Sequence, residues 1–215
     1  MMNNNIGEYI KAARIAAGMS QTTLAEGLVS NSLLSLIEAG KRTASPELIE
    51  AFAQRLRVHP EVLTYGVDGA AMDALLRDAA SLMADSEATD AAASELLLNE
   101  AFCRNPARQV RALQLRSNAR ERGGRMDEAL TDIQAALALL PVAIDAQDEL
   151  QVSIDCIRVM RNLNLLQDAL DFGERVSRNV PGELVGTPVH ARVLANLVIL
   201  CFYLGEFARA RTVAE

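Results

Sequence analysis

The stretch from Met19 to Arg42, MSQTTLAEGLVSNSLLSLIEAGKR, decides the fold of the first part of this chain. It has the pattern of two short helices that are joined by a tight turn and followed by a basic loop. Ser20 and Ser30 stand where these helices would begin, and a serine there caps free backbone N–H groups. Apolar residues recur at helical spacing and would fix the angle between the helices; they are Leu24, Ala25, Leu28, Leu34 and Ile37.

This segment is similar to the helix-turn-helix of Xre/Cro-type repressors. The matching positions are Ser20-Gln21, Leu24-Ala25-Glu26, Val29-Ser30, Ile37-Glu38 and Gly40-Lys41-Arg42. The turn is one residue shorter than is usual in that family, and Gly27 is expected to supply its left-handed conformation. The resemblance implies a five-helix, repressor-like DNA-binding domain over residues 1–66.

Three further helices are expected around this pair. Apolar residues at helical spacing from Ile6 to Ala17 predict a first helix that ends at Gly18. Ser45-Pro46-Glu47 predicts a helix start, because it combines a cap, a proline in the first turn and an acid near the positive end of the helix dipole. A short fifth helix is expected over 61–65.

The resemblance assigns DNA contacts to the second helix of the pair and to the loop behind it. Asn31 would pair with adenine through two hydrogen bonds, and Leu36 would touch a thymine methyl group. The base-reading candidates are Asn31, Ser32, Ser35 and Leu36, and the phosphate-binding candidates are Gln21, Lys41 and Arg42. The alternative is that Asn31 and Ser32 are only favourable first-turn residues. Leu33 is apolar, yet it is expected to face outward.

The charge of the chain is unevenly distributed. The 215 residues carry a formal net charge of −7, but residues 1–65 contain six basic and six acidic side chains. Nonspecific affinity for DNA grows with the number of phosphates that a protein neutralises, so one neutral domain would bind weakly. We therefore expect a homodimer on a two-fold site in double-stranded DNA.

A repeated pattern follows the first domain. The segments 124–129, 164–169 and 205–210 each lead to an alanine, and these alanines recur at intervals of 40 and 41 residues. Pro141 and Pro181 follow the first two and are expected to end helices. The pattern is similar to the tetratricopeptide repeat, in which a small residue lets two helices pack closely; Asn164 takes the place of the usual glycine.

An earlier unit is expected over about residues 73–106. The resemblance predicts an all-α fold, with an α-solenoid of degenerate helical hairpins over residues 67–215. A generic helical bundle is the alternative.

In register with that family, the first helix of each hairpin lines a concave inner face. The candidate ligand-binding residues on it are Arg111, Gln114, Asn118, Arg122, Gln151, Arg158, Asn162, Arg192 and Asn196. Arginine binds carboxylates through forked hydrogen bonds, and asparagine can bind the backbone of an extended peptide. This face is therefore expected to hold a short peptide or a protein. The alternative is that these residues are solvated polar groups on exposed helices.

The combination of the two domains resembles bacterial peptide-sensing transcriptional regulators of the RRNPP type. The resemblance implies a cytoplasmic homodimer in which peptide binding changes the spacing of the two DNA-reading helices. A second hypothesis is a protein-interaction scaffold, such as an antitoxin or a signalling adaptor, with autoregulatory DNA binding.

Several classes of function are not expected from this sequence. It shows no paired His, Cys or carboxylate constellation and no glycine loop that could cradle a phosphate, so neither an enzyme nor a cofactor or metal is expected. Cys103, Cys156 and Cys201 are widely spaced and are expected to be free thiols. No apolar run approaches the roughly 20 residues that cross a bilayer, so no membrane partner is expected. The chain stops within an expected helix, and we expect it to be part of a longer protein.

Overall fold

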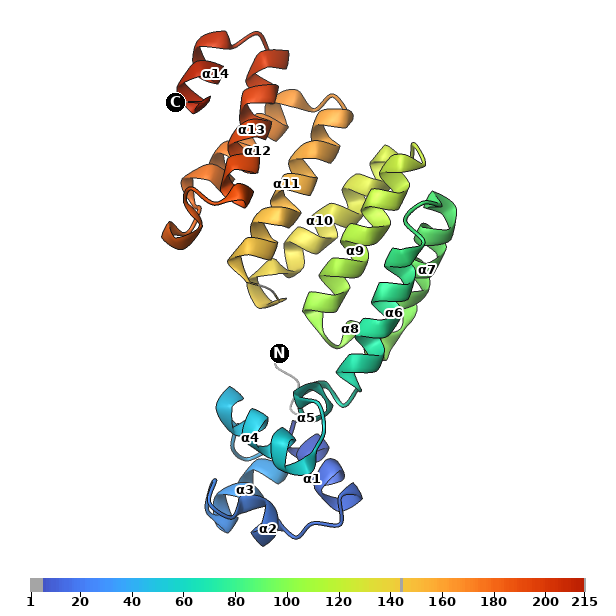
Figure 1. Ribbon diagram of the computed structural model, residues 1–215, viewed down its shortest axis with the longest axis vertical. Helices are drawn as coiled ribbons and strands as arrows, with labels where there is room; N and C mark the ends of the chain where they lie inside the picture. The colour runs from blue at the N-terminus through green and yellow to red at the C-terminus, as the bar shows by residue number, and fades with distance from the viewer. Residues whose placement is uncertain (1–5, 144, 215) are drawn as a thin grey trace. The chain divides into compact units, whose positions relative to one another are not determined.

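The computed structural model describes residues 6–143 and 145–214, and all regular secondary structure in these residues is helical (Figure 1). The all-α fold that the sequence predicts is thereby confirmed. The chain divides into two compact units. The first unit contains the residues up to Arg77 together with Glu100–Arg104, and the second contains Asp78–Asn99 and the residues from Asn105 onward. The predicted domain boundary, between residues 66 and 67, lies slightly before this division.

The first unit contains the five predicted helices. They are α1 (Ile6–Ala16), α2 (Gln21–Ala25), α3 (Asn31–Glu38), α4 (Pro46–Leu56) and α5 (Pro60–Tyr65). The predicted caps form, because Ser20 Oγ accepts from the backbone N–H of Thr23 at 3.0 Å and Ser30 Oγ accepts from that of Leu33 at 3.2 Å. Gly27 has a φ of 71°, as the short turn requires.

The core of the first unit joins all five helices. Ile10, Leu24, Leu34, Phe52 and Leu63 are completely buried and belong to one apolar cluster. The outward orientation expected for Leu33 is wrong, because this side chain is partly buried against the same cluster. Its packing leaves the polar residues of α3 to form the outer face of that helix.

The remaining helices form the repeats and the segment that precedes them. They are α6 (Gly69–Ser81), α7 (Ser86–Leu98), α8 (Glu100–Cys103), α9 (Pro106–Arg122), α10 (Met126–Ala143), α11 (Ala146–Asn162), α12 (Leu166–Arg178), the 3₁₀ turn η1 (Gly182–Leu184), α13 (Pro188–Tyr203) and α14 (Phe207–Ala214). Three hairpins, α9–α10, α11–α12 and α13–α14, stack in order in the second unit, and α7 packs on α9 (Figure 1).

The small residues of the repeat pattern lie where the two helices of a hairpin meet. Ala129, Ile133 and Ala136 on α10 and Ala169 on α12 are completely buried. One predicted helix end is wrong: α10 continues through Pro141 to Ala143, although proline lacks the backbone N–H that would bind the carbonyl four residues earlier. The second prediction is confirmed, since α12 ends at Arg178, before Pro181.

The three hairpins turn in the same way. Gly124, Asn164 and Gly205 have φ angles of 78°, 61° and 76°, in the left-handed region. In each turn the next residue donates its backbone N–H to a carbonyl five positions earlier: Arg125 to Arg120, Leu165 to Met160 and Glu206 to Cys201, at 2.8–2.9 Å. Asn164 therefore occupies a glycine position of the repeat, as its place in the sequence pattern predicts.

The left-handed backbone conformation of Asn164 has an effect on stability that can be measured. Replacing Asn164 by glycine is expected to raise the free energy of unfolding by about 0.5 kcal/mol, because glycine adopts this φ without strain. Replacing it by valine is expected to lower that free energy by about 1–2 kcal/mol. Urea-induced unfolding of the three proteins tests both values. Asn179→Gly is the matched control, since Asn179 ends α12 with a φ of −108° and its replacement by glycine should destabilise. The same sign for both glycine variants would contradict the interpretation.

Candidate DNA-reading helix and ligand face

The outer face of α3 carries the residues that were predicted to read DNA. Asn31, Ser32, Ser35 and Leu36 are exposed, whereas Leu34, Ile37 and Glu38 on the other side of this helix are buried. The arrangement presents short polar side chains and one aliphatic group on a single exposed surface. Such a surface can reach hydrogen-bonding base edges and thymine methyl groups in a major groove.

A buried ion pair fixes α3 against the helices before it. The guanidinium of Arg14, on α1, binds the carboxylate of Glu38 in a bidentate manner, with Nε–Oε1 and Nη2–Oε2 distances of 2.7 and 2.9 Å. Arg14 also donates to the backbone carbonyl of Met19 at 2.9 Å, just before the cap of α2. The Glu38 side chain is only 3% exposed. One arginine thus joins α1, the start of α2 and the end of α3.

The protonation of Glu38 depends on opposing influences. Burial by itself raises the pKa of this carboxyl group, but hydrogen bonds from Arg14 and Gln21, together with the positive charges of Arg14 and Lys11, outweigh it. The pKa of Glu38 is therefore lower than its ordinary value. The carboxylate stays ionised at neutral pH and keeps its pairing with Arg14.

The predicted phosphate contacts fall into two groups. Lys41 and Arg42 are exposed in the loop after α3, where their charges are free to meet a DNA backbone. Gln21 is different, because its side-chain amide donates to Glu38 Oε2 at 2.8 Å. This orientation does not support the predicted phosphate contact. The side chain of Gln21 is a second support for Glu38 instead.

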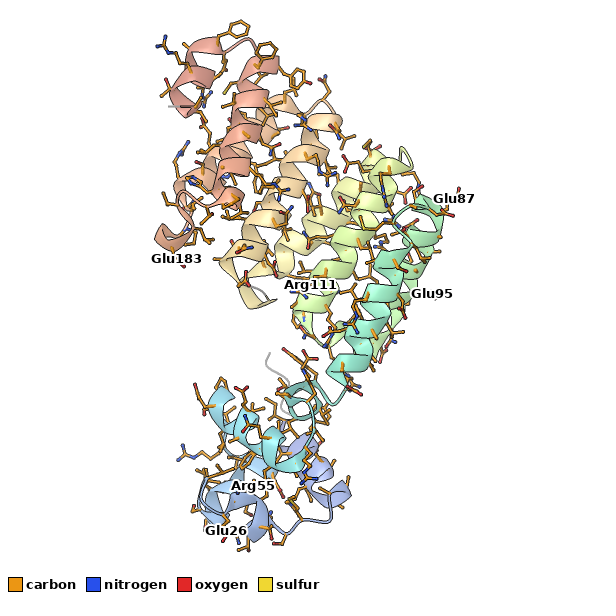
Figure 2. The ribbon with its side chains drawn as sticks, viewed as in Figure 1. Glu26, Arg55, Glu87, Glu95, Arg111 and Glu183 are labelled. Atoms are coloured by element: carbon orange, nitrogen blue, oxygen red, sulfur yellow. The ribbon has the colours of Figure 1, made fainter. Side chains whose placement is uncertain are left out.

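Two features of this support were not predicted from the sequence. Arg55, on α4, donates to the backbone carbonyls of Leu24 and Glu26, at 3.0 and 2.5 Å, and so holds the end of α2; Figure 2 labels Arg55 and Glu26. Gly7, on α1, lies so close to α3 that a Cβ atom would stand 2.0 Å from the carbonyl oxygen of Ile37. A glycine on a helix gives little warning in the sequence that another backbone lies against it.

The ligand-binding candidates of the repeats lie on α9, α11 and α13, which stand side by side (Figure 1). The structure brings most of them together, but it pairs them with one another. Arg158 Nη2 donates to Asn118 Oδ1 at 2.5 Å, and Asn162 donates to Glu121 Oε1 at 2.6 Å. Arg192 donates to Gln151 Oε1 at 2.6 Å. We call this set of side-chain hydrogen bonds between α9, α11 and α13 the inner-face ladder.

Two acidic residues complete the inner-face ladder, and the sequence prediction missed both. Asp155 accepts from Gln114 at 3.0 Å and from Gln151 at 3.3 Å, and it also pairs with Arg158 at 3.1 Å. Glu121 pairs with Arg158 at 2.5 Å. The repeat length could have indicated these acidic partners, because residues that pair across neighbouring helices of the ladder lie 37, 40 or 41 positions apart.

The remaining candidates lie at the margins of the inner-face ladder. Arg111, labelled in Figure 2, makes an exposed ion pair with Asp148 at 3.3 Å, and such pairs contribute little to stability. Arg122 turns away and donates to the backbone carbonyl of Met83. Asn196 accepts from Arg161 at 3.4 Å and donates to the carbonyl of Arg192. The ligand-binding role of all these residues stays a prediction.

A second ionic cluster, also unpredicted, lies between α7, α9 and α10. Asp132 is 2% exposed and accepts two hydrogen bonds from Arg116, at 2.6 and 3.0 Å, and one from Arg120 at 3.0 Å. Arg120 reaches on to Asp90 at 3.0 Å, and Arg125 pairs with the same carboxylate at 2.8 Å. These charges join three helices in the interior, so their role is to hold the stack.

The three cysteines are free thiols, as predicted. Burial, aided by the negative charge of Asp155, raises the pKa of Cys156 to about 11, which makes its thiol unreactive at neutral pH. Within residues 6–143 and 145–214, no group of three His, Cys, Asp or Glu side chains is placed to hold a metal ion. No helix in the described part of the chain is long and apolar enough to cross a membrane.

Comparison with known proteins agrees with this geometry. Residues 10–63 match the family model described as helix-turn-helix, so the first unit is a helix-turn-helix domain, as the sequence resemblance indicates. Among solved structures, Bacillus thuringiensis PlcR in complex with the peptide PapR7 and DNA is similar over 98% of this chain and 77% of that chain, with 14% identity and a TM-score of 0.59. That likeness shows a shared fold. The Streptococcus dysgalactiae SHP pheromone receptor Rgg2 aligns over 97% of both chains, with 14% identity and a TM-score of 0.28. No curated protein sequence matches.

Proposed function

We propose that this protein is a sequence-specific DNA-binding transcriptional regulator that acts in the cytoplasm as a homodimer and whose repeats sense a peptide or protein ligand. One observation carries the proposal: the exposed face of α3 presents Asn31, Ser32, Ser35 and Leu36 on a helix that the Arg14–Glu38 pair holds rigidly. A base-reading helix must be fixed in this way, because its side chains have to meet base edges within hydrogen-bonding distance.

The charge balance of the first unit supports the dimer. Residues 1–65 have six basic and six acidic side chains, so few phosphates can be neutralised by one copy. Two copies on a two-fold site double both the phosphate contacts and the base contacts. A regulator built in this way gains affinity only when its two reading helices are spaced as the two half-sites require.

The repeats offer a means to alter that spacing. PlcR, which shares the fold, was crystallised with a peptide and DNA, and this supports a peptide as the ligand here. Because the inner-face ladder joins α9 to α11 and α11 to α13, a ligand that competes for these groups would change how the repeats pack. A ligand that prefers one packing shifts the population toward it.

Substitutions in the two groups of predicted contacts are expected to weaken DNA binding in two different ways. A target duplex is first selected from a random-sequence pool by its binding to the wild-type protein. Fluorescence anisotropy at several salt concentrations then measures the affinity of each variant for this duplex and for a scrambled duplex. The double variant Asn31→Ala/Ser32→Ala is expected to lose about tenfold or more of the discrimination between the duplexes. Lys41→Ala/Arg42→Ala is expected to weaken binding to both duplexes alike. It should also lower the magnitude of the slope of log affinity against log salt concentration by about 2.

Gln54→Ala provides the control for this experiment, because Gln54 is exposed on α4 and belongs to neither group of predicted contacts. Its affinity and salt slope should equal those of the wild-type protein. If both double variants bind like the control while their circular dichroism shows intact helices, or if the selection enriches no sequence, the DNA assignment is wrong.

A further inference from the structure

The inner face changes character at the third hairpin. The left-handed turn residues Gly124, Asn164 and Gly205 align the three first helices with offsets of 40 and 41 residues. By these offsets, Asn118 on α9 corresponds to Arg158 on α11 and to Ile199 on α13. Likewise, Arg122 and Asn162 correspond to Tyr203. At these two positions the side chains are polar in the first two hairpins and apolar or aromatic in the third, whereas Arg111, Gln151 and Arg192, which correspond by the same offsets, are polar in all three.

These apolar side chains are exposed together. Ile199 is 40% exposed, Tyr203 63%, Phe202 64% and Phe207 62%. The rings of Phe202 and Phe207 pack edge to face, with 5.5 Å between their centroids. The whole chain has only five phenylalanines and three tyrosines, so three of its eight aromatic residues gather at this point. Exposed aromatic side chains offer apolar area either to a ligand or to a further segment of the protein.

A cavity of about 520 Å³ opens beside these residues. It is lined by Arg161, Asn162, Val198, Ile199, Phe202 and Tyr203. The Arg161 guanidinium donates a hydrogen bond to the amide oxygen of Asn196, at 3.4 Å, and it has no carboxylate partner among the residues that the structure describes. Arg158, one turn earlier, is held by both Glu121 and Asp155. The cavity thus combines an apolar wall with a cation that lacks an acidic partner.

We infer that this cavity binds an apolar side chain that stands next to a carboxylate, as at the C-terminal residue of a peptide that ends in an aromatic or large aliphatic side chain. The inference rests on the proposed function of the repeats and assigns the place at which the ligand is recognised. The polar groups of the inner-face ladder already satisfy one another, whereas Arg161 does not meet a carboxylate. The carboxylate of the ligand pairs with Arg161, and its side chain covers Ile199 and Tyr203.

The smallest probe of this chemistry is N-acetyl-L-phenylalanine, which has one aromatic ring and one carboxylate. We expect titration into the isotope-labelled full chain to shift NMR resonances of residues 161–162 and 198–203, with saturation in the millimolar range. N-acetyl-L-phenylalaninamide, which has the same ring without the charge, is expected to bind about fivefold more weakly. Arg161→Gln should abolish this difference, and Ile199→Asp should weaken both probes.

Arg178→Gln is the matched control, because Arg178 lies on α12, pairs with Glu174 and does not line this cavity. Its preference for the acid over the amide should equal that of the wild-type protein. Equal binding of acid and amide to the wild-type chain, or shifts centred on another surface, would overturn the inference. The inference would also be overturned if the protein self-associates and Phe202→Ser abolishes this association, because the patch would then be a contact between copies of the chain. The Asn31→Ala/Ser32→Ala variant should keep the preference for the acid over the amide. A failure of the DNA-binding proposal can therefore be distinguished from a failure of this inference.

Discussion

Replacing Glu38 with alanine is expected to lower the free energy of unfolding of the first unit by about 3–5 kcal/mol. The substitution leaves the guanidinium of Arg14 buried without its carboxylate and removes the acceptor of the Gln21 amide. Isolated buried charges are costly because they lose water without gaining a partner. Thermal unfolding of the full chain, together with hydrogen exchange of the segment 31–38, measures the loss.

The charge of Glu38 also makes this stability depend on pH. Because the folded-state pKa is lowered, the contribution is complete above the unfolded-state pKa, ordinarily about 4.3 for glutamate, and is lost as the pH falls through the folded-state pKa. Glu38→Gln is expected to lose part of the stability and most of this acid dependence. Glu50→Ala removes an equal charge from an exposed position and should change little. If Glu38→Ala and Glu50→Ala unfold alike, the ion pair does not hold α3.

The second large effect is expected at Asp132. Asp132→Ala leaves Arg116 and Arg120 in the interior of the second unit without the carboxylate that both of them bind. The free energy of unfolding is expected to fall by about 3–5 kcal/mol. Hydrogen exchange of the segments 106–122 and 126–143 is expected to accelerate, because Asp132 joins α9 and α10.

Two variants separate this charge effect from a general one. Asp132→Asn keeps the shape and one acceptor oxygen, so it should be less damaging than the alanine variant. Glu95→Ala removes an exposed acid from α7, labelled in Figure 2, and should leave the exchange of α9 and α10 unchanged. Comparable acceleration in Glu95→Ala would show that net charge, and not the buried cluster, is responsible.

Local signals were sufficient for much of the fold. Each helix start at Ser20, Ser30 and Ser45 follows from the chemistry of one side chain and its own backbone, and the caps form as expected. The repeat period by itself likewise places Asn164 in a glycine position, and its φ angle lies in the left-handed region. Both kinds of signal act within one turn or one repeat, which is the range over which sequence patterns are informative.

Features that depend on several helices could not be predicted in the same way. Gln21 turns to Glu38 only because α1 brings Arg14 to that carboxylate, and Leu33 is covered by packing that its helical position alone does not show. Asp132 is unremarkable in the sequence until α9 closes over it. Most of the polar candidates of the inner face lie together on α9, α11 and α13, but their pairing with one another depends on α9 and α11 lying side by side.

The regular separation of the ladder partners has a mechanical consequence. Contacts that join residues 37, 40 or 41 positions apart link each hairpin to its neighbour alone. A stack of hairpins in which only neighbours are in contact unfolds one hairpin at a time under force. If the chain is pulled at its C-terminal end in an optical trap, α13–α14 should detach first and lengthen the chain in a separate step. Refolding can then start again from any hairpin that remains.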